Sequence, residues 1–123
     1  MKAPILPAGL DEVTRWYRVP EREKVEDFLG AHPEIVPVLL EARPYLEKQF
    51  GPKAVVELRI PFDYETGTRD DLFAYALTRI DPDEATDRMD RFWDDWWGAA
   101  KDEHPDLPLN FDVDYDVNGQ TQE

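Results

Sequence analysis

The sequence contains no cysteine, which excludes disulfide bonds, thiolate zinc sites and cysteine nucleophiles. It also lacks an apolar run long enough for a signal peptide or a membrane span, so we expect a cytoplasmic protein that makes no membrane contact. The motifs GxGxxG, GxxxxGK[ST], GxSxG and HExxH are missing as well. Only two histidines occur, His32 and His104, and each precedes a proline. Together these absences favour a non-catalytic protein over an enzyme.

Basic residues are few: 14 lysines and arginines stand against 28 aspartates and glutamates, and the net charge is −14. Residues 81–116 carry most of the imbalance, with thirteen acidic and three basic side chains, whereas residues 1–53 have a net charge of only −1. Nucleic-acid binding requires a basic surface, so we expect no direct contact with nucleic acid. The charge suits a basic protein partner, a divalent cation, or solubility alone.

Prolines and glycines divide the chain into three parts. We expect an irregular N-terminal segment at 1–20, a single α+β domain at 21–117 and a flexible tail at 118–123. Within the first segment, one or two helical turns at 11–17 would be anchored by Trp16 or Tyr17.

Hydrophobic periodicity predicts helices at 21–29 and 32–50, the second kinked or split near Pro44. It predicts strands at 54–62, 71–80 and 109–117. An aromatic helix over 81–101 separates the last two strands, so the order of elements is α-α-β-β-α-β.

The predicted fold class is α+β, with a small antiparallel sheet of about three strands. Both faces of the strand at 71–80 are apolar, which suits a central or doubly covered strand. A right-handed crossover that skips one place would nevertheless put the third strand beside the first and give the order 2-1-3. The aromatic helix would then pack on one face of the sheet.

The aromatic helix contains three of the four tryptophans. Trp96 falls on the central line of its apolar face, and we expect it to be buried against the strands. The strand residues expected around it are Leu58, Ile60, Phe111 and Val113. We expect Trp97 at the solvent edge. An aromatic edge bordered by acids favours a partner-binding surface of Trp93, Trp97, Asp94 and Asp95, with plain core packing as the alternative.

The last strand alternates apolar and acidic residues, so Asp112, Asp114 and Asp116 project from one face at a spacing of about 7 Å. This row predicts either a divalent-metal site or a solvated strand face on which Arg59 is the natural counter-charge. Residues 114–119 also match the opening of a calcium loop, but the closing acid of such a loop would fall beyond Glu123.

Four segments resemble a family of small, uncharacterised bacterial proteins. They are FLGAHPEIVPVLLEA at 28–42, FGPKAVVELRI at 50–60, DPDEATDRMDRFWDDWW at 81–97 and LNFDVDYD at 109–116. The family pattern has, in the same order, an FL-Pro-LLLEA helix, an FG turn, a helix ending in an acidic-Trp-Trp motif, and a strand with acidic alternation. The resemblance implies a shared fold; it implies no catalytic residues, because no activity is established for the family.

The leading functional hypothesis is a non-catalytic acidic interaction or regulatory protein that binds another, basic protein and needs no cofactor. The alternative is a metal-dependent hydrolase or nuclease, which would hold a divalent cation on clustered aspartates. Besides the strand row, Asp87, Asp90 and Asp94 share one helix face and offer a second cluster, or simply a solvated face. A nucleic-acid mimic and a homo-oligomer stay open.

Overall fold

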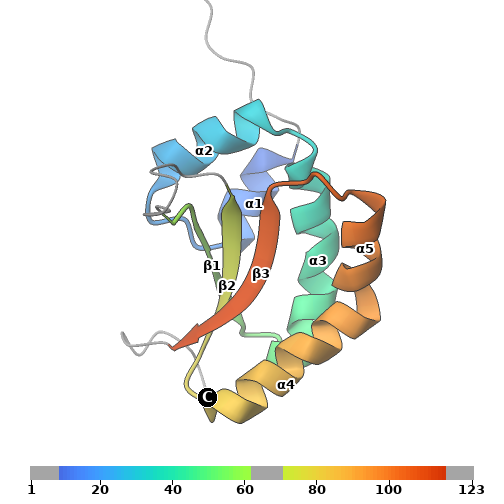
Figure 1. Ribbon diagram of the computed structural model, residues 1–123. Helices are drawn as coiled ribbons and strands as arrows, with labels where there is room; N and C mark the ends of the chain where they lie inside the picture. Colours follow the sequence, from blue (N-terminus) through green and yellow to red (C-terminus); the bar gives the residue numbers. More distant parts are fainter. Residues whose placement is uncertain (1–8, 62–70, 116–123) are drawn as a thin grey trace, which may run out of the picture.

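The computed structural model describes residues 9–61 and 71–115, which form an α+β fold (Figure 1). The helices that precede the sheet are α1 (Leu10–Trp16), α2 (Arg22–Ala31) and α3 (Ile35–Phe50). The strands are β1 (Val55–Arg59), β2 (Leu72–Thr78) and β3 (Leu109–Tyr115). Between β2 and β3 run α4 (Pro82–Phe92), a π-helical turn η1 (Trp93–Trp97) and α5 (Gly98–Glu103).

This architecture confirms the predicted fold class, and α1 forms where one or two helical turns are predicted at 11–17. None of the described helices is long and apolar enough to cross a membrane. The predicted extensions of β1 to residue 62 and of β3 to residues 116–117, the loop at 63–70 and the tail at 118–123 lie outside the described residues. The second predicted helix is not split, because α3 runs continuously through Pro44.

The described sheet is mixed and has the order β1-β2-β3. β1 and β2 are antiparallel, whereas β3 runs parallel to β2, with Leu72 opposite Leu109 and Thr78 opposite Tyr115. The predicted antiparallel sheet with the order 2-1-3 is therefore wrong. β2 is apolar on both faces, which is typical of a central strand, and the crossover through α4 returns directly to its side.

One face of the sheet packs against the helices, as Figure 1 shows for α3, α4 and α5. Small residues on β2, Ala74 and Ala76, are only 1% exposed and leave room for aromatic side chains from the helical layer. Phe92 lies edge-on to Phe111 of β3, with ring centroids 5.0 Å apart. The predicted packing of the aromatic helix on one sheet face is thus confirmed.

The π-helical turn changes which tryptophan is most deeply buried. Trp97 has no exposed surface and Trp96 is 8% exposed, so the prediction that Trp97 lies at the solvent edge is wrong. In a π turn the backbone bond spans five residues, here from the Gly98 N–H to the Trp93 carbonyl, and the helix is wider than an α-helix. Phe92 and Trp97, five apart, consequently share the inner face.

Trp96 is also buried, as expected, but α3 contributes more to its surroundings than the sequence indicates. Its ring stacks on Tyr45 of α3 at 5.4 Å, and its indole N–H donates to Glu41 at 2.9 Å. Of the strand residues predicted around it, Phe111 makes a ring contact at 6.2 Å.

Candidate functional site

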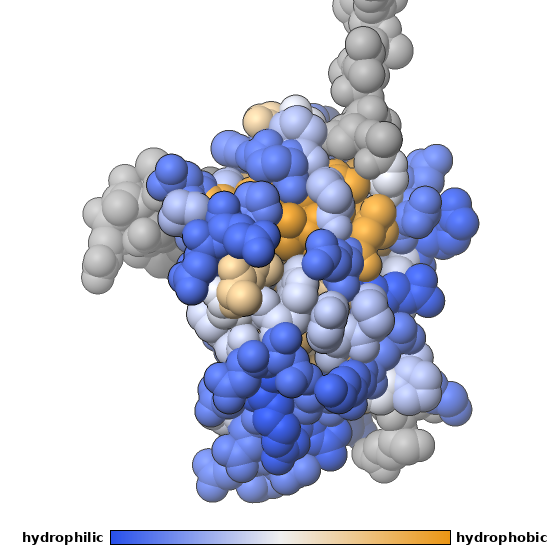
Figure 2. All heavy atoms as spheres, turned by 90° about the vertical axis from the view of Figure 1, so that its right-hand side faces the viewer, coloured by the Kyte–Doolittle hydropathy of each residue, from blue (hydrophilic) through white to orange (hydrophobic). Residues whose placement is uncertain are grey.

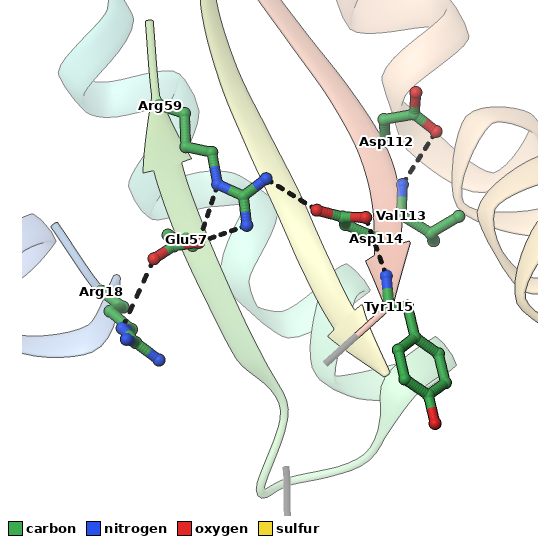
Figure 3. Close-up of polar contacts among 7 residues, drawn as sticks. All are labelled: Arg18, Glu57, Arg59, Asp112, Val113, Asp114 and Tyr115. Carbon is green, nitrogen blue, oxygen red and sulfur yellow. Dashed lines mark hydrogen bonds and ion pairs between the residues drawn. The ribbon is translucent and has the colours of Figure 1, made fainter. Parts of the chain in front are cut away.

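The face of the sheet that points away from the helices carries a charged network (Figure 3). Arg59 of β1 donates from Nε to Glu57 Oε2 at 2.7 Å and from Nη1 to Asp114 Oδ2 at 2.7 Å. Arg18, just after α1, reaches Glu57 Oε1 at 3.5 Å. Arg59 therefore joins two strands across β2, and its predicted pairing with the aspartate row is confirmed for Asp114.

Backbone pairing holds Arg18 in this network. Its N–H donates to the Val56 carbonyl at 2.8 Å, and its carbonyl accepts from the Leu58 N–H at 2.9 Å. The chain after α1 thus covers the outer edge of β1. The sequence around Arg18 has no strand pattern, so this contact was missed and no sequence signal would have found it.

Burial on this face shifts two pKa values. Burial lowers the pKa of Arg59, but hydrogen bonds to Asp114 and Glu57 outweigh that effect, and the pKa is raised overall. Burial also raises the pKa of Tyr75, with a further rise from the charge of Asp112. The guanidinium group of Arg59 lies 4.6 Å from the centre of the Tyr75 ring. Arg59 therefore stays a cation, and Tyr75 stays a neutral phenol, around neutral pH.

The two described members of the aspartate row accept hydrogen bonds from the backbone of their own strand. Asp112 Oδ1 accepts from the Val113 N–H at 2.8 Å, and Asp114 Oδ1 accepts from the Tyr115 N–H at 2.9 Å. Asp116, the third predicted ligand, lies outside the described residues. Within residues 9–61 and 71–115, no group of three or more acids or histidines could hold a metal ion. A metal site that includes Asp116 stays a prediction.

Each of the two histidines lies near Glu34. His32 Nδ1 lies 3.6 Å from Glu34 Oε1, and His104 lines a surface pocket of about 250 Å³ together with Glu34 and Asp106. The sequence alone did not connect these residues. They do not form a metal-binding group in the part of the chain that the structure describes.

Four exposed carboxylates form what we call the acidic helix face, which is Asp83, Asp87, Asp90 and Asp94. They recur at steps of four, three and four residues along α4 and into η1, which places them on one side of the helix. In Figure 1, α4 lies at the lower end of the molecule. Figure 2 shows the molecule turned by 90° about the vertical axis, and hydrophilic side chains cover its lower part. The predicted helix cluster of Asp87, Asp90 and Asp94 belongs to this face.

The predicted partner-binding residues separate into exposed and buried members. Asp94 is exposed, and Asp95 pairs with Lys48 of α3 at 3.0 Å. Trp93 is half-buried, with the Lys101 Nζ 5.9 Å from its ring centre. Trp97 is wholly buried and takes no part in this surface, which corrects the prediction. The reason is again the π turn, which places Trp97 on the inner face.

Tyr17 is the anchor of the N-terminal helix, as the sequence predicts. Its ring is 2% exposed, and its hydroxyl donates to the Leu39 carbonyl of α3 at 2.6 Å. Burial raises the pKa of Tyr17 well above its ordinary value, and the nearby charge of Arg43 offsets this only in part.

This raised pKa predicts a loss of stability at alkaline pH. Above pH ~10 the unfolded chain releases the tyrosine proton and the folded protein keeps it, so stability falls by up to about 1.4 kcal/mol per pH unit. Below that pH the contribution is fully present. Tyr17→Phe should remove the part of this slope that Tyr17 contributes and cost about 1 kcal/mol at neutral pH for the lost hydrogen bond. Urea unfolding between pH 7 and 12 measures both, and Tyr115→Phe, at an exposed site, should leave the slope unchanged.

No protein-family model, curated protein or solved structure matches this chain. The resemblance to bacterial proteins with an acidic-Trp-Trp helix therefore stays a prediction.

Proposed function

We propose that this protein is a non-catalytic interaction or regulatory protein that binds a basic protein partner through the acidic helix face. The cysteine-free composition suits the reducing cytoplasm, where we place this binding.

The observation that supports this proposal most is that the carboxylates of the acidic helix face form no ion pairs within the described residues. Among the described residues, Asp83, Asp87, Asp90 and Asp94 have no ion-pair partner, although Arg88 of the same helix pairs with Glu84 at 3.1 Å. Unpaired like charges in a row repel one another, which costs stability that a cationic partner would recover.

The setting of this face also supports binding to a partner. Below the acids, Met89 and Phe92 fix α4 to the core, so the carboxylates stand on a rigid element. Complementary charge on a rigid surface raises association rates and selects partners more than it adds raw affinity. We therefore expect a complex that forms quickly and weakens as salt screens the charges.

Affinity capture from an extract of the source cell tests the proposal. The wild-type chain should retain a basic protein in stoichiometric amount at about 50 mM salt and lose it at about 500 mM, where screening is strong. The variant Asp83→Asn/Asp87→Asn/Asp90→Asn should lose the same protein at low salt.

A matched control neutralises the same number of exposed acids elsewhere on the surface. The variant Glu12→Gln/Glu23→Gln/Asp27→Asn has the same net charge but changes α1 and α2. It should retain the partner as the wild type does. Capture of nothing at low salt, or equal loss in both triple variants, would refute a specific role of the acidic helix face.

A further inference from the structure

β3 has one open edge in the described sheet, because β2 pairs with only one of its sides. The Leu72 N–H of β2 donates to the Pro108 carbonyl at 2.9 Å, so the backbone groups of even-numbered residues in this strand face β2. Those of odd-numbered residues, including Val113 and Tyr115, face the open edge. An edge of this kind can pair with an added strand.

Two carboxylates block this edge. The N–H groups of Val113 and Tyr115 donate to the side chains of Asp112 and Asp114 and are therefore not free for an incoming strand. Figure 3 shows Asp112 and the Val113 nitrogen on the side of β3 that is turned away from β2. Asp114 is also held by Arg59, whereas Asp112 is exposed and has no ion-pair partner among the described residues.

An apolar pocket of about 190 Å³ opens beside the same edge, at the inner side of the sheet. Val113 and Tyr115 line it from β3, and Pro82 and Ala85 line it from the first turn of α4. The alternation of the strand places Tyr115 on the same face as the buried Phe111, yet Tyr115 is 59% exposed and is the one large hydrophobic side chain so exposed in the described residues. The helical layer leaves this end of β3 uncovered.

We propose that the basic partner adds an extended segment to the open edge of β3, with basic and apolar side chains in alternation. This inference rests on the proposed function and names the kind of segment that is bound. Successive side chains of a strand point to opposite faces. Basic side chains would therefore meet Asp112 and Asp114 on the outer face, while an apolar side chain enters the pocket on the inner face.

The same carboxylates would select the partner. A lysine or arginine of the added strand draws the Asp112 carboxylate away from the Val113 N–H, and this donor then pairs with a partner carbonyl. A neutral or acidic strand leaves the carboxylate in place, so the edge stays blocked. Specificity of this kind comes from an obstacle that only the correct partner removes.

Titration with short capped peptides tests the proposal. The probe is a lysine–valine alternating heptapeptide, followed by NMR amide shifts and by calorimetry. It should bind at the β3 edge at least tenfold more tightly than a peptide of the same composition with its lysines and valines in two blocks. N-methylation of alternate backbone nitrogens should weaken it by a similar factor. Equal binding of the alternating and the block peptide would overturn strand addition.

A single substitution distinguishes binding at the β3 edge from attraction to the overall negative charge of the protein. Asp112→Asn keeps an oxygen that can accept from Val113 but removes the charge, and it should weaken the alternating peptide about tenfold. Asp102→Asn, an exposed position on α5, changes the net charge equally and should have no such effect. Equal affinities of the two variants would contradict the role of Asp112.

The proposed function and strand addition can fail separately. Suppose that a partner is captured through the acidic helix face, but the peptide binds equally well to the wild type and to Asp112→Asn. This result would support the proposed function and overturn strand addition. A capture experiment that retains nothing would overturn the function itself.

Discussion

Replacing Trp97 with alanine is expected to lower the free energy of unfolding by about 3–5 kcal/mol, the usual cost of removing a large buried aromatic side chain. Trp97 has no exposed surface. Its ring lies edge-on to Phe111 at 4.7 Å and near Trp96 at 5.7 Å. The cavity would therefore open between the π turn and β3, where the surrounding rings cannot easily close it. Urea denaturation measures the change.

Two comparisons make this prediction specific to the π turn. Trp93→Ala, at a half-buried position, should cost clearly less than Trp97→Ala. Trp97→Phe should lose no hydrogen-bond energy, because the buried Trp97 N–H has no partner in the described residues. Trp96→Phe should lose the hydrogen bond that the Trp96 N–H donates to Glu41, and this lowers the free energy of unfolding further. A larger loss for Trp93→Ala than for Trp97→Ala would show that the turn presents another face to the core.

The sequence could predict the aromatic helix and its sheet-facing side, but not the π turn. A regular helix places Phe92, Trp96 and Ala100 on one line, and that period indicated Trp96 as the centre. The wider turn inserts one residue into the repeat, which brings Trp97 under the helix. Gly98 follows at a point where an added Cβ would lie 3.0 Å from the Trp93 carbonyl oxygen, so a glycine fits the tight contact. Only the packing, not the periodicity, reveals this change.

Strand order shows a similar limit. The alternation in β1 and β3 indicated their inner and outer faces, and with them the pairing of Arg59 with the aspartate row. The order 2-1-3 followed from a crossover rule that does not specify how many places are skipped. The contact of Arg18 with β1 depends on how α1 docks, through Tyr17, on α3, and this information is not local in the sequence.

Glu57→Gln is expected to lower the free energy of unfolding by about 1–3 kcal/mol, the cost of an unmet buried polar group or charge. Glu57 is 6% exposed and lies between two arginines. Removing one partner of a fully buried ion pair costs more, but here the arginine side chains are 32% and 36% exposed, and water screens part of the loss. Arg18 Nη1 is already buried without a hydrogen-bond partner in the described residues, so it would lose its nearby anion as well.

The same substitution should also loosen the end of β3, because Arg59 links Glu57 to Asp114. Without Glu57, Arg59 is held from one side only, and amide exchange at Tyr115 should accelerate more than exchange in the core strand β2. Glu47→Gln, which removes the half-buried partner of the exposed Arg43 at 3.6 Å, is the control and should cost less than about 0.5 kcal/mol. If Glu57→Gln were equally mild and left Tyr115 exchange unchanged, the network would be a set of independent surface pairs. The orientation of Asp114 at the open edge would then depend on β3 alone.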